Sequence, residues 1–294
     1  MFSHPPLIFL PLQDSQTMAD TNQKQLNIPR DTAIALGEDA ISAIENGYYI
    51  NSNGSAVDWH PAVQHAINSK ISIRPDDALP TSPHEKRLAT RITVVNENTL
   101  LTARRATQQS LRPLVLNMAN GIQPGGGFFH GARAQEETLC RSSALYATLK
   151  NDPMYKTHSL RVLPDSSDWA IYSPGVPVFR DETGTSLDQP WLMNVITCAA
   201  PYAPGVGQPD AANLLRQRIH RVLAIARAYG YRDLVLGAWG CGAFGNDPRQ
   251  TALDFRSAFE NEFRGVFEQI WFSISDWSPE RRFLGPFAEV FSET

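Results

Sequence analysis

A glycine triplet, a glutamine and two adjacent glutamates lie close together in the sequence and could support chemistry on a phosphorylated sugar. The triplet Gly125–Gly127 has no Cβ atoms, so its backbone can adopt positive φ angles and bring N–H groups close to a bulky anion. Gln135, Glu136 and Glu137 follow after a short spacer, and carboxylates are common general acids and bases. A phosphate-tolerant loop beside two carboxylates favours hydrolysis over hydride transfer or phosphoryl transfer.

The two glutamates are expected to have different roles. Adjacent residues on a helix project about 100° apart, so one carboxylate can hold a ribose hydroxyl while the other faces a glycosidic oxygen. A helix N-terminus lowers the pKa of a carboxyl group, whereas a general acid needs a raised pKa. We therefore expect burial against Phe128 or Phe129, together with a nearby diphosphate, to raise the pKa of the acid. The simpler alternative is that both glutamates lie on the surface and complement the helix dipole.

A second glycine loop, Gly240–Gly245, fits the pattern G-x-G-x-x-G. It follows an apolar, strand-like run and precedes a helical pattern, so it is a candidate site for a diphosphate at a helix N-terminus. The complete dinucleotide-binding fingerprint opens the first strand–helix–strand unit and has an acidic residue roughly 20 positions later. Here one strand remains after the loop, which favours diphosphate binding without a full dinucleotide fold. The alternative is a turn that only packs a helix against a strand.

Composition excludes several classes of protein. The net charge of -4 over 294 residues is unlike that of a general nucleic-acid coat protein, which needs a positive surface. Cys140, Cys198 and Cys241 are odd in number and form no C-x-x-C motif, which favours a reducing compartment. No H-E-x-x-H motif is present, so we expect no metal and no cofactor. The apolar opening segment is short and interrupted by prolines, so we expect no membrane span.

The order of predicted elements indicates one large domain over residues 28–294, after a disordered segment over residues 1–27 in which Met18 is an alternative start. We predict a helix from Ile28 to Gly47, an Asn-Gly hairpin over 48–59 and a short helix over 60–67. The strand over 111–118 delivers the first glycine loop at its carboxyl end, where open α/β sheets bind ligands. The further predicted strands cover 91–96, 170–179, 191–199, 234–238 and 269–274, and the further helices cover 99–110, 136–150, 214–229 and 248–263. This succession predicts a three-layer α/β/α fold with a mixed central sheet.

With both loops considered, the sequence resembles the microbial-type poly(ADP-ribose) glycohydrolases, a branch of the macrodomain fold. The most specific segment is GGGFFHGARAQEE at 125–137, which has the triple glycine and Gln-Glu-Glu of that family. The resemblance extends from about residue 28 to 276, and its supporting segments are NMANG at 117–121, SPGVPVFRD at 173–181 and LGAWGCGAFGND at 236–247.

The resemblance implies an ADP-ribose ligand whose diphosphate lies between the two glycine loops. It implies that Glu137 is the acid and base that cleaves a ribose–ribose O-glycosidic bond, and that Glu136 holds the ribose at that bond. Asn120 would hydrogen-bond the distal ribose, and Phe244 would pack against it. The ligand contacts implied by motif position are Asn120, Gly125, Gly126, Gly127, Gln135, Gly240, Cys241, Gly242, Ala243, Phe244 and Gly245.

The residue that reads adenine departs from the pattern of the fold. Macrodomains carry an Asp after the early strand, whereas this chain has Glu97 and Asn98. Either residue is a candidate. Tyr202, which follows Ala-Ala-Pro, is a further aromatic candidate near the ligand.

Two other functions are compatible with the same motifs. One is a reader that binds ADP-ribose without chemistry, although a reader has no need of Glu136 and Glu137. The other is a hydrolase of mono-ADP-ribosylated protein or of a free ADP-ribose derivative. We expect poly(ADP-ribose) or ADP-ribosylated proteins as partners, no direct nucleic-acid readout, a monomer, and a cytoplasmic location, or a nuclear one if the source is eukaryotic.

Overall fold

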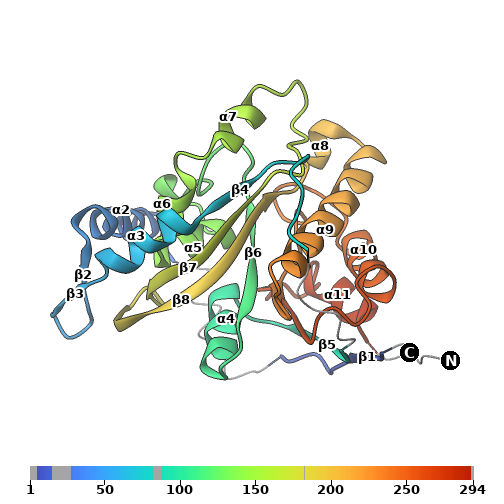
Figure 1. Cartoon of the computed structure of the whole chain (residues 1–294), viewed down its shortest axis with the longest axis horizontal. Coiled ribbons are helices and arrows are strands. Elements are labelled where there is room, and N and C mark those ends of the chain that lie inside the picture. The colour runs from blue at the N-terminus through green and yellow to red at the C-terminus, as the bar shows by residue number, and fades with distance from the viewer. Residues whose placement is uncertain (1–4, 15–27, 82–87, 182, 293–294) are drawn as a thin grey trace.

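An eight-stranded mixed sheet forms the centre of the molecule (Figure 1), and its strand order is β1-β5-β10-β9-β6-β8-β7-β4. The computed structural model describes residues 5–14, 28–81, 88–181 and 183–292. In this sheet order, each neighbouring pair in β1-β5-β10-β9-β6-β8 is parallel. Strand β7 is antiparallel to both of its neighbours, β8 and β4. The strands of this sheet are β1 (Leu7–Phe9), β4 (Ile71–Ile73), β5 (Thr90–Val95), β6 (Pro113–Ala119), β7 (Ala170–Arg180), β8 (Ser186–Ala199), β9 (Asp233–Leu236) and β10 (Gln269–Ser273).

Helices cover both faces of the sheet, as the α/β/α prediction requires. Figure 1 shows α2, α3, α5 and α6 on one side, and α9, α10 and α11 on the other. The helices on the first side, with α4, are α2 (Arg30–Asn46), α3 (His60–Ser69), α4 (Thr99–Gln108), α5 (Gln135–Ser142) and α6 (Leu145–Leu149). The remaining helices are α7 (Pro153–Ser159), α8 (Ala203–Val206), α9 (Asp210–Ala228), α10 (Pro248–Glu260) and α11 (Leu284–Val290). In the described part of the chain, no helix has the length and apolar character to cross a bilayer.

Side chains that point alternately to the two faces of each strand form the two apolar layers. In β6, Leu114 and Leu116 join the cluster that packs under α9 and α10, whereas Val115 joins the cluster under α4 and α5. Successive side chains of a strand point to opposite faces, so a continuous apolar run is what a strand covered on both faces needs. Burying one such side chain contributes about 1.5–3 kcal/mol.

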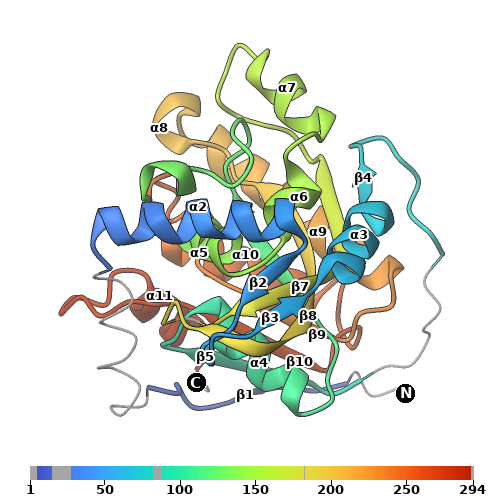
Figure 2. The same ribbon diagram turned by 90° about the vertical axis from the view of Figure 1, so that its left-hand side faces the viewer.

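The predicted N-terminal helix and hairpin are confirmed. Helix α2 ends at Gly47, whose φ of 77° is left-handed and favours glycine. Strands β2 (Tyr48–Ile50) and β3 (Ala56–Asp58) then form the antiparallel hairpin. Figure 2 shows α2 crossing in front of the sheet beside α5, and the short 3-10 helix η1 (Phe128–His130) also contacts α2. This extension therefore supports the loop that precedes the two glutamates.

Two predictions about elements are wrong. Residues 5–14 are not disordered. Strand β1 pairs with β5, and Phe9 packs against Phe291 with ring centroids 6.1 Å apart. The rest of the predicted disordered segment, residues 1–4 and 15–27, lies outside the described residues. The helix predicted over 136–150 is divided into α5 and α6. Ser143 causes the break, because its Oγ donates to Leu139 O at 2.8 Å and accepts from Leu145 N at 3.2 Å, which replaces helical hydrogen bonds.

Candidate active site

A cavity of about 420 Å³ lies at the carboxyl ends of the parallel strands β6, β9 and β10. The start of α5, the second glycine loop and the segment after β10 complete its wall. Its lining includes Asn98, Met118, Asn120, Arg133, Gln135, Glu136, Glu137, Gly240, Gly242, Ala243, Phe244, Ser275 and Phe283. Both predicted motifs therefore meet at one cavity.

The Glu136 carboxylate is buried and held on both oxygens. Oε2 accepts from the backbone N–H of Asn120 at 2.7 Å, and Oε1 accepts from Asn117 Nδ2 at 3.3 Å. The pKa of Glu136 is raised to about 8, mainly by burial and also by the charge of Glu137, whereas the N–H donor of Asn120 opposes the shift. Glu136 is thus immobile and holds a proton near neutral pH.

Glu137 is also buried, with 8% of its surface exposed, but only one of its oxygens is occupied. Oε1 accepts from the backbone N–H of Gly127 at 2.9 Å. Oε2 is buried and has no hydrogen-bond partner within the described residues. Because Glu137 lines the cavity, Oε2 is the carboxylate oxygen of this pair that a ligand can use.

The glycine triplet has a different role from the predicted one. Gly125, Gly126 and Gly127 do not belong to the cavity lining. Their N–H groups donate to the Glu136 carboxylate, to Gln123 O and to Glu137 Oε1 respectively. Two of the three N–H groups therefore bind carboxylates of the next helix, which could not be read from the triplet itself, and a contact of the triplet with a diphosphate stays a prediction.

Glycine is required at the centre of that loop. A Cβ atom on Gly126 would lie 2.3 Å from Glu137 Oε1 and 3.1 Å from Glu136 Oε2, and its φ is +59°. The ring of Phe128 is fully buried and packs against Phe129 and Tyr146, with centroids 4.0 and 5.0 Å away. The aromatic residues pack against the loop, and the loop in turn holds the carboxylates through its N–H groups.

Gln135 lines the cavity, but its amide is already bonded to the protein. Oε1 accepts from Met118 N at 3.0 Å, and Nε2 donates to Leu116 O at 2.7 Å and to Thr99 Oγ1 at 3.3 Å. These bonds tie the first turn of α5 to β6. Gln135 therefore places the two glutamates, and its contact with a ligand stays a prediction.

Asn120 also lines the cavity and closes the turn that begins the first loop. Its Oδ1 accepts from the backbone N–H groups of Ile122 and Gln123 at 2.9 and 3.0 Å. The side-chain Nδ2 donates to no acceptor in the described part of the chain. This amide group is available to a ribose hydroxyl.

The second glycine loop contributes four of its six predicted residues to the cavity: Gly240, Gly242, Ala243 and Phe244. The backbone N–H groups of Gly242, Ala243 and Phe244 have no acceptor among the oxygens that the structure describes. Three such donors close together suit a diphosphate. Asn246 fixes the loop from behind, since its Nδ2 donates to Pro201 O at 2.9 Å and to Gly240 O at 3.1 Å.

Cys241 and Gly245 lie outside the cavity, contrary to the prediction. The Cys241 thiol is buried, contacts Trp239 O and Thr251 Oγ1 at 3.5 and 3.6 Å, and has its pKa raised to about 12 by burial. Gly245 forms the turn at a φ of +67°. Both residues shape the loop, and a contact of either with a ligand stays a prediction.

Only one of the two candidates for adenine faces the cavity. The Glu97 carboxylate accepts from Thr102 Oγ1 at 2.7 Å and from Arg105 Nη1 at 2.9 Å, and it is absent from the lining. Asn98 lines the cavity and caps α4 by accepting from Leu101 N at 3.0 Å. The geometry therefore excludes Glu97 and leaves Asn98.

Sequence reasoning missed Asn117, which holds Glu136 from the floor of the site. Its Nδ2 also contacts Thr197 Oγ1 on β8 at 3.2 Å. A signal was present, because Asn117 is a polar residue within the apolar run of β6 and is completely buried. A buried amide in a central strand needs hydrogen-bond partners.

Comparison with known proteins places this α/β/α fold and its paired glutamates among macrodomain-type hydrolases. The family model described as microbial-type PARG, catalytic domain, matches residues 37–181. No curated protein matches the chain. The solved structure of poly(ADP-ribose) glycohydrolase from Thermomonospora curvata is 38% identical, with a TM-score of 0.84, and covers 88% of this chain and 99% of its own.

Two further solved structures carry ligands. The Thermomonospora curvata enzyme bound to the inhibitor ADP-HPD has a TM-score of 0.81 at the same identity and coverage. The Deinococcus radiodurans poly(ADP-ribose) glycohydrolase in complex with ADP-ribose is 35% identical, has a TM-score of 0.71, and covers 78% of this chain and 97% of its own. The chain belongs to the microbial-type poly(ADP-ribose) glycohydrolase family.

Proposed function

We propose that this chain hydrolyses the ribose–ribose O-glycosidic bonds of poly(ADP-ribose) and releases ADP-ribose, with Glu137 as the catalytic residue. The observation that carries the proposal is the arrangement of the two carboxylates. Glu136 is held on both oxygens, whereas Glu137 is held on Oε1 and presents a buried Oε2 at the cavity. A binding module has no need of such a group.

The ligand is placed by the donors around the cavity. Its diphosphate lies against the N–H groups of Gly242, Ala243 and Phe244, near the N-terminus of α10, where anions are favoured. The distal ribose lies between Phe244 and Asn120, beside Glu136. This position brings the anomeric carbon and the leaving oxygen of the scissile bond next to Glu137 Oε2.

The reaction needs one group that first gives and then takes a proton. Glu137 Oε2 donates its proton to the leaving ribose oxygen, and the bond from that oxygen to the anomeric carbon breaks. The oxocarbenium-like centre that remains is stabilised by the adjacent diphosphate. The Glu137 carboxylate then removes a proton from water, whose oxygen bonds to the anomeric carbon. Glu137 is protonated again, and ADP-ribose carries the new hydroxyl.

The proton is supplied by the coupled carboxylate pair. Burial raises the pKa of Glu136 to about 8, so this neighbour of Glu137 retains a proton near neutral pH. We propose that the pair holds this proton as a unit, and that substrate binding places it on Glu137 Oε2, which has no protein partner among the described residues.

The proposed site of action is a reducing compartment such as the cytoplasm. Its support is that Cys140, Cys198 and Cys241 are all free and buried.

Incubation with poly(ADP-ribose) tests the function. The wild-type protein should release free ADP-ribose, detected by chromatography, and Glu137→Gln should release it at least about 100-fold more slowly. Calorimetry should give the same ADP-ribose affinity for both proteins. Tight ADP-ribose binding without release by the wild type would instead identify a reader.

A further inference from the structure

An apolar surface borders the catalytic cavity outside the residues that line it. We name it the apolar rim and define it as Ile122, Leu163 and Tyr202, whose exposed fractions are 53%, 50% and 40%. Leu160 and Val162 extend it outward and are 77% and 99% exposed. Large apolar side chains gathered beside a site are a feature of binding surfaces.

The rim is continuous with one end of the cavity. The Tyr202 ring meets the Phe244 ring edge-on, with centroids 6.0 Å apart, and Phe244 lines the cavity. The backbone N–H of Tyr202 donates to Pro164 O at 3.0 Å, which places the loop of Leu163 beside it. Ile122 follows the cavity residue Asn120 by two positions. The rim therefore lies at the end of the cavity that Asn120 and Phe244 form.

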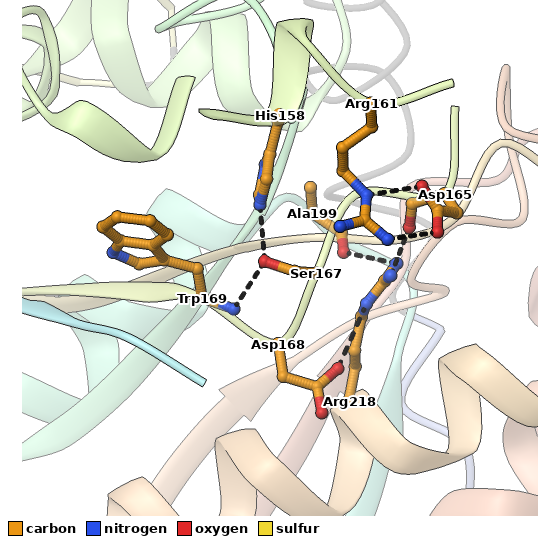
Figure 3. Close-up of polar contacts among 8 residues, drawn as sticks. All are labelled: His158, Arg161, Asp165, Ser167, Asp168, Trp169, Ala199 and Arg218. Carbon is orange, nitrogen blue, oxygen red and sulfur yellow. Dashed lines mark hydrogen bonds and ion pairs between the residues drawn. The ribbon is translucent and has the colours of Figure 1, made fainter. Parts of the chain in front are cut away.

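A buried histidine fixes the segment between α7 and β7 against the first loop; Figure 3 shows its contact with Ser167. His158 Nδ1 lies 3.0 Å from Gly121 O, and its Nε2 lies 2.7 Å from Ser167 Oγ. Since a carbonyl oxygen only accepts, Nδ1 carries the hydrogen and Nε2 accepts from the Ser167 hydroxyl. Burial lowers the pKa of His158 to about 4, so this arrangement persists at neutral pH.

A buried arginine fixes the other side of the same segment (Figure 3). Arg218 is completely buried, donates to Ala199 O at 3.1 Å and to Asp165 O, and lies 3.6 Å from Asp168 Oδ1. Arg161 Nε donates to Asp165 Oδ1 at 2.6 Å. The segment is thus tied to Gly121 and to the end of β8, which restricts its motion before a ligand arrives. A rigid surface loses less entropy on binding.

The rest of the polymer determines what can occupy the rim. A cavity of about 420 Å³ has the size of a site for a single small ligand, so it takes one ADP-ribose unit. If the proposed function holds, the scissile ribose lies at the Asn120 and Phe244 end, and the leaving unit emerges beside the rim. That unit carries an adenine base, whose flat apolar face suits an exposed aromatic ring.

We propose that the apolar rim is a subsite for the adenine base of the ADP-ribose unit on the leaving side of the scissile bond, with Tyr202 as its stacking platform. This inference rests on the proposed function. Leu163 and Ile122 flank the base and exclude water from it. The polymer contacts the rim through the adenine base of its second unit, whereas free ADP-ribose has no second base to place there.

Steady-state kinetics with poly(ADP-ribose) test the subsite. Tyr202→Ala should raise KM about tenfold or more, because an aromatic platform for one base is lost, whereas Tyr202→Trp should keep KM near the wild-type value. The affinity for free ADP-ribose, measured by calorimetry, should not change. Tyr48→Ala is the matched control, since Tyr48 is 46% exposed and lies on the distant hairpin.

Polymer binding without cleavage separates the subsite from the proposed function. Glu137→Gln with Tyr202→Ala should bind poly(ADP-ribose) about tenfold more weakly than Glu137→Gln alone. That result supports the subsite even if the wild type releases no ADP-ribose, which would overturn the proposed function alone. An unchanged polymer affinity and KM would overturn the subsite. An equal loss of affinity for free ADP-ribose would also overturn the subsite. A defect confined to protein-linked polymer would overturn it too, and would identify a surface for the carrier protein.

Discussion

The two adjacent glutamates differ in how many of their oxygens the protein occupies. Both oxygens of Glu136 accept hydrogen bonds, whereas Oε2 of Glu137 has no partner in the described residues. The sequence predicted two roles from the angle between neighbouring helical side chains, and family resemblance assigned them. The structure supplies the physical reason, because a group whose bonds are filled can hold a position but cannot easily transfer a proton to a ligand.

The raised pKa of Glu136 predicts a dependence of stability on pH. The pKa of Glu136 is about 8 in the folded protein and its ordinary value is 4.5, so between these values the folded protein binds a proton that the unfolded chain lacks. The free energy of unfolding should therefore fall as pH rises through this window, by up to about 1.4 kcal/mol per pH unit. Urea titrations at several pH values should show a shallower slope for Glu136→Gln. An identical slope in both proteins would contradict the assignment.

Catalysis is predicted to require glycine at position 126, because a Cβ atom there would displace the Glu137 carboxylate. Gly126→Ala should lower kcat/KM at least about tenfold by displacing the Glu137 carboxylate, in addition to the cost of about 1 kcal/mol for a left-handed alanine. Gly54→Ala is the matched control, because Gly54 has a φ of +78° and no atom within 4 Å of its Cβ position. Both variants should lose stability in urea titrations through the left-handed alanine, and Gly126→Ala should lose more because its Cβ meets the Glu137 carboxylate. Equal activity of the two variants would show that the close approach at Gly126 has no effect on the chemistry.

At the scale of elements, the first turn of α5 is placed by Gln135. Its amide joins the turn to Met118 and Leu116 of β6 and to Thr99 of α4. Replacement by methionine keeps the shape but leaves backbone groups of β6 without partners, each at a cost of about 1–3 kcal/mol where it is buried.

Gln135→Met should therefore destabilise the protein by at least about 1 kcal/mol and lower kcat, because α5 carries both carboxylates. Urea titration and steady-state kinetics provide the two measurements. Gln108→Met, at the exposed end of α4, is the control and should match the wild type. A Gln135→Met protein with wild-type stability and kcat would show that the amide does not place the helix.

Elements that depend on local signals could be predicted from the sequence, whereas those that depend on distant partners could not. The glycine at the end of α2 and the Asn-Gly turn act within a few residues. Strand β1 exists because β5 offers an open edge, and α5 ends where Ser143 bonds to its own backbone neighbours. Neither event has a periodic signature. The elements β4, α7, α8 and α11 were not predicted, although Asp152 followed by Pro153 is a local start signal for α7.

At the scale of the whole molecule, the carboxyl ends of the parallel strands bring together residues that are far apart in sequence. The Gln-Glu-Glu that follows the first glycine loop and the glycine loop after β9 meet at the cavity. Which atoms of those loops face the cavity was not predictable, because the N–H groups of the glycine triplet bond to the carboxylates of α5. Composition and motif order therefore located the site, and three-dimensional packing decided the role of each residue.

The central claim is that Glu137 performs the chemistry while the rest of the site positions it. Single-turnover cleavage of poly(ADP-ribose), with enzyme in excess, tests this claim because it separates the chemical step from binding and product release. Glu137→Gln should slow the step by at least about 100-fold, with ADP-ribose affinity unchanged. A Glu137→Gln protein that cleaves the polymer at the wild-type single-turnover rate would contradict the account.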